Sequence, residues 1–240
     1  MEIRILSDIT ETAEAAAEDA AGFIRENPGV LICFAAGDTT LPVFKALIQM
    51  QKENKLDLST VYYAGLDEWV GLDRETKGSC AQVMFDEFFD PARIPEKRIC
   101  MWNGMCDDID IERHRLENWI SSHGGIAMTM LGIGMNGHIG FNEPFTGLSE
   151  GTVYVPLDAT TKKVSVKYFN EARSVAYGIS IGAGELKKAR KVILIATGPG
   201  KAEIVKKTVI NGQDEAVPAS LMTDHPDITL FLDKASAVLL

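Results

Sequence analysis

Hydrophobic positions along the chain alternate between short β-rich runs and longer stretches with helical spacing. The short apolar runs predict strands at residues 30–36, 61–66, 127–131, 176–181, 192–196 and 228–232. Helical spacing predicts helices at residues 10–27, 41–54, 80–89, 109–122, 184–190 and 200–210. This alternation indicates an α/β protein of three layers, with a mostly parallel central sheet flanked by helices in a Rossmann-like arrangement. No repeat or linker divides the chain, so we expect residues 1–240 to form a single domain.

The charge balance narrows the range of partners. Acidic residues outnumber basic ones by 34 to 24, which gives a formal net charge of −10. Without a basic stripe, such a chain is expected to bind neither nucleic acid nor an anionic membrane, although two or three local donors suffice for a small anion. No apolar run approaches the ~20 residues of a membrane span. Residues 1–8 carry three charges and make a poor signal peptide, so we expect a cytoplasmic protein.

The four cysteines do not indicate a metal site or a redox pair. Cys33, Cys80, Cys100 and Cys106 form no CxxC pair, and no cysteine–histidine cluster has the spacing of zinc ligands. Cys33 lies inside an apolar run, where a buried free thiol is the usual state. We therefore expect four reduced thiols and no bound metal.

Four segments that follow predicted strands or open helices are rich in glycine, carboxylate and amide residues. They are residues 35–40, 65–72, 132–144 and 197–201. In open α/β sheets, ligands bind beyond the carboxyl ends of the strands, where such loops lead into helices. The sequence therefore predicts a binding site at this edge of the sheet.

The segment from Gly132 to Gly137 matches the pattern GxGxxG but lacks the context of a dinucleotide site. That motif opens a helix, whereas here Gly140 and Pro144 follow and disfavour one. We therefore expect no nicotinamide cofactor. The loop is better interpreted as a backbone that carries Asn136, His138 and Glu143 into a pocket; the alternative is that His138 only satisfies a loop carbonyl.

Two segments resemble the signatures of the glucosamine-6-phosphate deaminase/isomerase family. They are Gly-Leu-Asp-Glu-Trp-Val-Gly-Leu at residues 65–72 and Asn-Gly-His-Ile-Gly-Phe-Asn-Glu-Pro at residues 136–144. The likeness extends to residues 37–40 and 198–201. It implies a sugar-phosphate isomerase type of α/β fold. It also implies conversion of an amino-sugar 6-phosphate to a ketose 6-phosphate plus ammonia, with no metal or redox cofactor.

The resemblance also implies roles for individual residues. The catalytic base of the family matches Asp67, the ring-opening histidine matches His138, and a supporting glutamate matches Glu143. The substrate and phosphate contacts match Gly37, Asp38, Thr39, Thr40, Gly137, Lys167 and Lys201. Lys167 departs from the arginine of the best-known members, and lysine binds phosphate as a point charge without the bidentate fork.

Asn136 is a second departure, because the family usually has an aspartate there. Asparagine at 136, together with Trp69, resembles the branch that acts on galactosamine 6-phosphate and makes tagatose 6-phosphate. We therefore expect galactosamine 6-phosphate to be favoured, with glucosamine 6-phosphate as the other candidate. Asn136 can hydrogen-bond His138 but supplies no negative charge, so we count Asn136 among the catalytic residues and expect a less basic His138 than in relatives with aspartate.

Other interpretations remain open from the sequence. A 6-phosphogluconolactonase-type hydrolase shares the scaffold but lacks the glutamate at 143, and a catalytically silent sugar-phosphate sensor would keep only the phosphate loop. Asp67 and Glu68 could be a solvated strand end, Lys201 could decorate a helix start, and the threonines at 39 and 40 could be helix caps. The expected partner is a small sugar phosphate, and the expected state is a monomer or small homo-oligomer.

Overall fold

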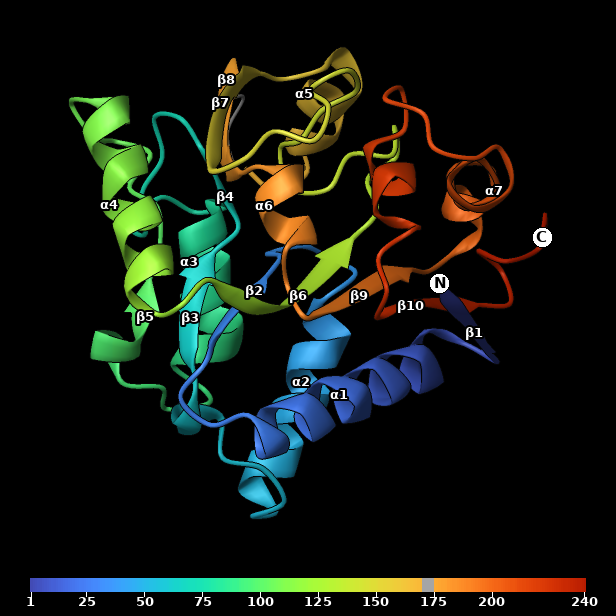
Figure 1. Cartoon of the computed structure of the whole chain (residues 1–240), viewed down its shortest axis with the longest axis horizontal. Coiled ribbons are helices and arrows are strands. Elements are labelled where there is room, and N and C mark those ends of the chain that lie inside the picture. The colour runs from blue at the N-terminus through green and yellow to red at the C-terminus, as the bar shows by residue number, and fades with distance from the viewer. Residues whose placement is uncertain (170–174) are drawn as a thin grey trace.

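Strands and helices alternate along most of the chain in the computed structural model, which describes residues 1–169 and 175–240 (Figure 1). The strands are β1 (Glu2–Leu6), β2 (Leu31–Phe34), β3 (Tyr62–Gly65), β4 (Asp67–Trp69), β5 (Ile99–Cys100), β6 (Ile126–Gly132), β7 (Thr152–Pro156), β8 (Tyr177–Ile181), β9 (Lys191–Ala196) and β10 (Ile228–Asp233). The α-helices are α1 (Ile9–Glu26), α2 (Leu41–Lys52), α3 (Cys80–Met84), α4 (Ile109–Ser122), α5 (Ala159–Ser165), α6 (Ala183–Lys187) and α7 (Ala202–Ile210). No helix within the described residues is long and apolar enough to cross a membrane.

Seven strands form the central sheet in the order β1-β10-β9-β6-β2-β3-β5, and every neighbouring pair is parallel. All their carboxyl ends therefore meet at one edge of the sheet. Near the middle, β2 and β6 are neighbours. The later strands β3 and β5 lie on the β2 side of this pair, whereas β9 and β10 lie on the β6 side, so the strand order reverses between β2 and β6. Ligands of open α/β sheets bind beside such a reversal of strand order.

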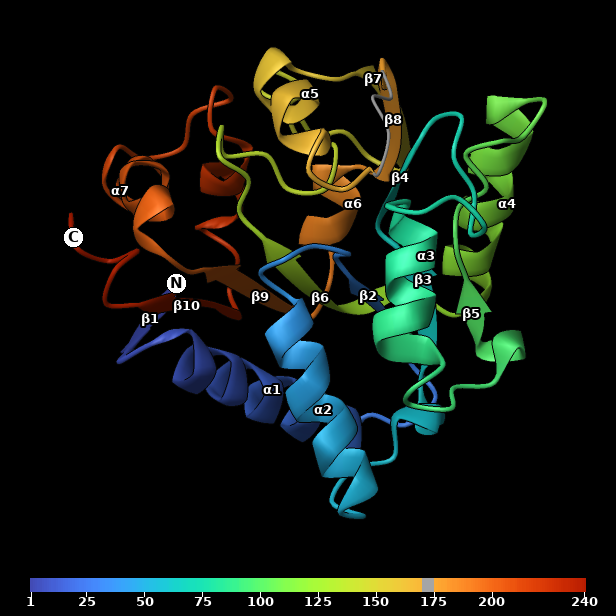
Figure 2. The same ribbon diagram turned by 180° about the vertical axis from the view of Figure 1, so that it is seen from behind.

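Alternating side chains of the central strands enter two separate cores. Leu31 and Cys33 of β2 pack on the face covered by α4, α6 and α7, whereas Ile32 and Phe34 pack on the face covered by α1 and α2. All four are at most 1% exposed, as expected for a strand buried on both faces. Figures 1 and 2 show α1 and α2 together on one side of the sheet and α4, α6 and α7 on the other. The predicted three-layer α/β fold is confirmed.

A second sheet of three short strands, β4-β8-β7, stands apart from the central sheet and is antiparallel. Figure 1 shows it beside α5, at the end of the molecule away from α1 and α2. The strand predicted at residues 176–181 is therefore real, but it belongs to this second sheet as β8. The sequence pattern did not distinguish the two sheets.

Several predicted elements agree closely with the structure, and their boundaries have local causes. The carboxylate of Asp108 accepts hydrogen bonds from the N–H groups of Asp110 and Ile111 and starts α4 at the predicted residue. The helix predicted at residues 80–89 is present but changes after α3 into one π-helical turn, Phe85–Phe89. Among the strands and α-helices of the described residues, β1, β4, β5, β7 and α5 were not predicted.

Candidate active site

A cavity of about 770 Å³ opens at the carboxyl edge of the central sheet. It is bounded by the loop after β2, the start of β4, the start of α3, the loop after β6, the segment from α5 to Tyr168, and the segment after β9. Residues from all four segments singled out in the sequence line it. They include Gly37, Asp38, Thr39, Thr40, Asp67, His138, Thr197 and Lys201, and Lys167 lines the cavity as well.

Asp67 is the first residue of β4 and is held in the second sheet by its pairing with Ser180 of β8. Its side chain lines the cavity although the residue is only 8% exposed. Burial raises the pKa of the Asp67 carboxyl to about 7, against the opposing effects of His138 and of a hydrogen bond with the Cys80 side chain. The interpretation of Asp67 as part of a solvated strand end is therefore wrong.

The Glu68 side chain points away from that of Asp67 and binds the first backbone N–H groups of α3. Its carboxylate oxygens accept hydrogen bonds from the backbone N–H groups of Trp69 (2.8 Å), Cys80 (3.0 Å) and Ala81 (2.8 Å). Burial raises the pKa of the Glu68 carboxyl to about 8, although the three N–H donors oppose the shift. Glu68 thus ties β4 to the segment that supplies the Cys80 side chain to Asp67.

His138 lies in the loop after β6, and its Nδ1 is 3.1 Å from Thr161 Oγ1 and 3.5 Å from Glu143 Oε2. Gly134 lies directly against the imidazole, because a Cβ at this position would come within 2.3 Å of the ring. The side chain is 23% exposed. Nδ1 thus faces the protein, and the ring borders the cavity.

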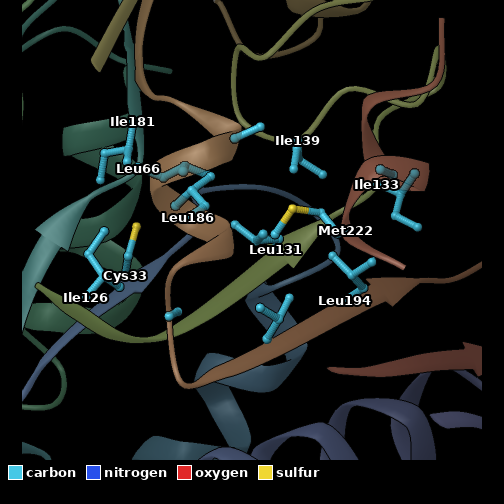
Figure 3. Packing of buried hydrophobic residues seen from close by; sticks show 14 of the residues in the cluster. Cys33, Leu66, Ile126, Leu131, Ile133, Ile139, Ile181, Leu186, Leu194 and Met222 are labelled. Carbon is cyan, nitrogen blue, oxygen red and sulfur yellow. The ribbon is translucent and has the colours of Figure 1, made fainter. Parts of the chain in front are cut away.

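The loop after β6 is anchored to the core on both sides of His138. Ile133 and Ile139 are 1% and 0% exposed and pack in the cluster that Figure 3 shows around Leu131 and Leu186. The buried Asn142 amide donates to the carbonyls of Ile139 and Ile181, both at 2.9 Å. Residues 133–144 contain no helix, unlike the segment that follows the glycines of a dinucleotide motif.

Glu143 and Asn136 lie behind His138 and do not line the main cavity. Asn136 Nδ2 donates to Glu143 Oε2 at 2.9 Å, and Asn136 lines a second cavity of about 410 Å³ on the far side of the loop. Gly137 is also absent from the main cavity. A Cβ on Gly137 would meet Val217, so this glycine packs against the segment before β10, and its contact with a substrate stays a prediction.

Two lysine side chains also line the cavity, Lys201 and Lys167. Lys201 Nζ donates to the carbonyl of Ile133 at 2.5 Å, and burial, together with the charge of Lys167, lowers the Lys201 pKa to about 8. Lys167 forms an ion pair with Asp38; burial alone would lower the Lys167 pKa, but this pairing raises it. A phosphate entering here would meet both ammonium groups, with Asp38 as a competitor for Lys167.

The loop from Gly37 to Thr40 is shaped by its last residue. The fully buried Thr40 hydroxyl donates to the carbonyl of Ala35 at 2.7 Å and accepts from the N–H of Gly37 at 3.2 Å. Thr40 occupies the N-cap position of α2 without making a side-chain cap, so the cap interpretation is wrong for Thr40. Within residues 1–169 and 175–240, the N–H groups of Asp38 and Thr39 have no hydrogen-bond acceptor. Such groups before a helix suit an anion.

Sequence reasoning missed two neighbours of the candidate residues, Thr161 and Cys80. Thr161 belongs to α5, a helix of seven residues that was not predicted. The available signal was Asp158, a helix-starting residue three positions earlier. Cys80 was recognised as a thiol, but its contact with Asp67 depends on the tertiary fold.

The cavity is lined by both acid–base groups and anion-binding groups. No group of three or more histidine, cysteine or carboxylate side chains in the described residues is placed to hold a metal ion. A buried carboxyl with a pKa near neutrality and an imidazole are suited to move protons on a substrate. The two lysines and the N–H groups of Asp38 and Thr39 are suited to hold its phosphate.

Comparisons with known proteins agree with this chemistry. A family model described as glucosamine-6-phosphate isomerases/6-phosphogluconolactonase matches residues 7–230. The chain is 36% identical to a glucosamine-6-phosphate deaminase of Thermoanaerobacter pseudethanolicus, over all of this chain and 95% of that protein. It is 34% identical to one of Clostridium perfringens over the full length of both.

Solved structures give the same picture. A structure described as a monomeric glucosamine-6-phosphate deaminase superposes with a TM-score of 0.96 at 30% identity, and the match covers 100% of both chains. A 6-phosphogluconolactonase from Thermotoga maritima superposes with a TM-score of 0.78 at 17% identity, covering 97% of this chain and 99% of the other. The second likeness concerns the fold alone.

Proposed function

The chain belongs to the family of glucosamine-6-phosphate isomerases and 6-phosphogluconolactonases, and from this premise we propose that its cavity isomerises and deaminates an amino-sugar 6-phosphate. The products are a ketose 6-phosphate and ammonia. Within the family, the relatives named glucosamine-6-phosphate deaminase match this chain over its whole length. The chain is thus an enzyme of the deaminase kind.

One observation carries the proposal: Asp67, His138 and Lys201 line the same cavity although they come from three distant segments. An acid–base pair alone would fit many reactions, and a cationic pocket alone would fit any phosphate. Together they favour a phosphorylated substrate whose other end undergoes proton transfer. The buried Asp67, with a pKa raised to about 7, is suited to act as a base near neutral pH.

Ring opening comes first in the proposed mechanism. The cyclic sugar has a masked carbonyl, so a proton must leave the hydroxyl on C1 and another must reach the ring oxygen. His138 is the candidate for both transfers, because imidazole exchanges protons near neutral pH. Glu143, 3.5 Å from Nδ1, would orient the ring and stabilise its charged form.

Isomerisation and deamination follow on the open chain. Asp67 takes the proton from C2, which gives an enolamine, and a proton returned to C1 gives an imine at C2. Water then adds to C2, and the C2–N bond breaks to release ammonia and leave a ketose. These steps transfer protons, add water and release ammonia, with no change in the overall oxidation state of the sugar.

Trp69 supports a finer proposal, that galactosamine 6-phosphate is preferred over glucosamine 6-phosphate. Trp69 lines the cavity two residues after Asp67 and is held by Phe141, with ring centroids 4.5 Å apart. In the galacto ring, the hydrogens on C3, C4 and C5 share one face, which makes an apolar patch that an indole can cover. The gluco ring breaks this patch with its equatorial hydroxyl arrangement at C4.

The direct experiment measures ammonia release from both amino-sugar 6-phosphates, with hydrolysis of 6-phosphogluconolactone in parallel. We expect ammonia from both sugars and a higher kcat/KM for the galacto form. Lactone hydrolysis without ammonia release would support the hydrolase alternative. Binding of the sugar phosphates without turnover would support a sensor.

A further inference from the structure

The amide nitrogen of Asn136 donates hydrogen bonds to two carboxylates. Nδ2 donates to Glu143 Oε2 at 2.9 Å and to Asp158 Oδ1 at 3.3 Å. Its Oδ1 accepts the backbone N–H of His138 at 3.2 Å. Because a carboxylate can only accept, this network fixes which end of the amide faces which partner.

Asp158 was not among the predicted site residues, and it does not border the main cavity. It lies at the N-cap of α5, where its carboxylate accepts from the N–H of Thr160 at 2.7 Å. The backbone N–H of Asp158 in turn donates to Glu143 Oε1 at 3.3 Å. Asp158 therefore contacts Asn136 through its side chain and Glu143 through its backbone.

These contacts connect α5 to the imidazole by two routes. The Asp158 cap starts the helix that carries Thr161, whose Oγ1 is 3.1 Å from His138 Nδ1. The Asn136 amide links Asp158 to Glu143, whose Oε2 is 3.5 Å from the same nitrogen. The ring thus meets a hydroxyl and a carboxylate that are both held by Asp158.

We propose that Asp158 is a positioning residue for His138 and that positions 136 and 158 form a matched pair, in which one carries an amide and the other a carboxylate. The proposal rests on the proposed function, since His138 is taken to transfer protons on the sugar. The Asp158 carboxylate supplies negative charge on the side of Asn136 away from the cavity, and Asn136 connects it to Glu143 by hydrogen bonds.

The pair explains why asparagine suits position 136 in this chain better than aspartate. An aspartate there would place three carboxylates together without a proton between them, at the Asn136–Glu143 and Asn136–Asp158 distances of 2.9 and 3.3 Å. Like charges at such distances repel strongly in a partly buried site. The conflict disappears when position 158 is neutral and offers a hydrogen-bond donor.

The test is a double-mutant cycle on kcat and KM for ammonia release. The variants are Asn136→Asp, Asp158→Ser, Asp158→Asn and the two doubles that combine Asn136→Asp with each neutral residue. Serine keeps a helix cap and adds an O–H donor, whereas asparagine keeps the size of the side chain and adds an N–H donor. Asp108→Ser, which changes the cap of α4 away from the cavity, is the matched control.

We expect Asn136→Asp to lower kcat by about tenfold or more with KM changed less than about twofold, since only positioning is lost. At least one double variant should recover kcat to within about threefold of wild type. Asp108→Ser should leave kcat unchanged. A fully active Asn136→Asp, or two doubles that are no better than Asn136→Asp alone, would overturn the proposal.

Thermal unfolding of the same proteins gives the cycle without any need for activity. We expect the unfolding midpoint to fall in Asn136→Asp and to return in a double variant. If wild type released no ammonia from either sugar, the proposed function would fail, and the unfolding cycle would still decide whether positions 136 and 158 are matched. Additive changes in the midpoint would reject the pair.

Discussion

At the residue scale, the chemistry of the cavity depends on how the fold shifts the pKa values of two side chains, Asp67 and Lys201. Burial raises the Asp67 pKa to about 7, and burial with a neighbouring cation lowers the Lys201 pKa to about 8. Both groups are thus shifted toward neutrality, as is common where protons are transferred or anions are bound. Their roles can be separated, because only one of them should affect the chemical step.

Replacement of Asp67 by asparagine tests its role as the base. Asp67→Asn keeps the shape of the side chain but cannot accept the C2 proton, so we expect kcat to fall by at least about 10²-fold, the lower end of general-base effects. Inorganic phosphate should bind as in wild type by calorimetry. Asp90→Asn, which changes an exposed carboxylate, is the control. Normal turnover by Asp67→Asn would remove Asp67 as the base.

The two shifted groups also predict a bell-shaped pH profile of kcat/KM. Asp67 acts as a base only when deprotonated, so kcat/KM should rise with pH through about 7. Lys201 binds phosphate best when charged, so kcat/KM should fall again as pH rises through about 8. In Lys201→Arg the guanidinium stays charged, and the alkaline limb should disappear from the measured profile. An unchanged alkaline limb would assign it to another group.

At the scale of elements, Glu68 joins β4 to α3, and Gly134 lets the loop after β6 fold against the imidazole. Neither residue is proposed to touch the substrate. The first makes three backbone hydrogen bonds within 3.0 Å, and the second leaves no space for a Cβ beside His138. Substitution of either residue is therefore expected to act through its neighbours, at Glu68 through the link between β4 and α3 and at Gly134 through the His138 ring.

Glu68→Gln should lower the unfolding midpoint, although the two side chains are nearly the same size. Both oxygens of the buried carboxyl accept N–H donors, whether or not it carries a proton, and an amide nitrogen cannot accept one of them. A buried donor left unpaired costs about 1–3 kcal/mol, which corresponds to a fall of several degrees in the unfolding midpoint. Calorimetry measures it. An unchanged midpoint would mean that the link between β4 and α3 contributes little.

Gly134→Ala should lower kcat without unfolding the protein. The new methyl would lie within 2.3 Å of the His138 ring, so the imidazole must move, and we expect a loss of at least about tenfold. Gly22→Ala in α1 is the matched control, because a Cβ there has open space and helix propensity favours alanine by about 0.5–1 kcal/mol. The two variants are compared by ammonia release and thermal unfolding. Equal kcat in both would exclude close packing of Gly134 on His138.

At the scale of the whole molecule, the sequence predicted the central strands and their covering helices better than the short strands and the edge strands of the sheets. The long apolar runs of β2, β6 and β9 are buried on both faces, and the alternation of strands with helices identified the parallel sheet. The unpredicted β1 is an exposed edge strand whose apolar residues alternate with charged ones, and β4 and β5 have only three and two residues. Such short or edge strands form because partners are nearby, so their own residues carry little signal.

The candidate site shows the same division. The loops at the carboxyl ends of strands could be predicted, since parallel strands bring those ends to one edge, and Asp67, His138 and Lys201 indeed line one cavity. The contacts of Asp158 and Thr161 could not, because they depend on where α5 packs. The packing of Gly137 against Val217 could not be predicted either, because sequence order does not tell which way a loop residue faces.

The central claim is that one cavity holds the phosphate near Lys201 while Asp67 and His138 act on the other end of the sugar. A crystal structure with an open-chain amino-alditol 6-phosphate tests it most directly. We predict the phosphate between Lys201 and the N–H groups of Asp38 and Thr39, with C1 and C2 within hydrogen-bond reach of the Asp67 carboxylate. A phosphate bound elsewhere, or an analogue whose C2 lies away from Asp67, would contradict the account.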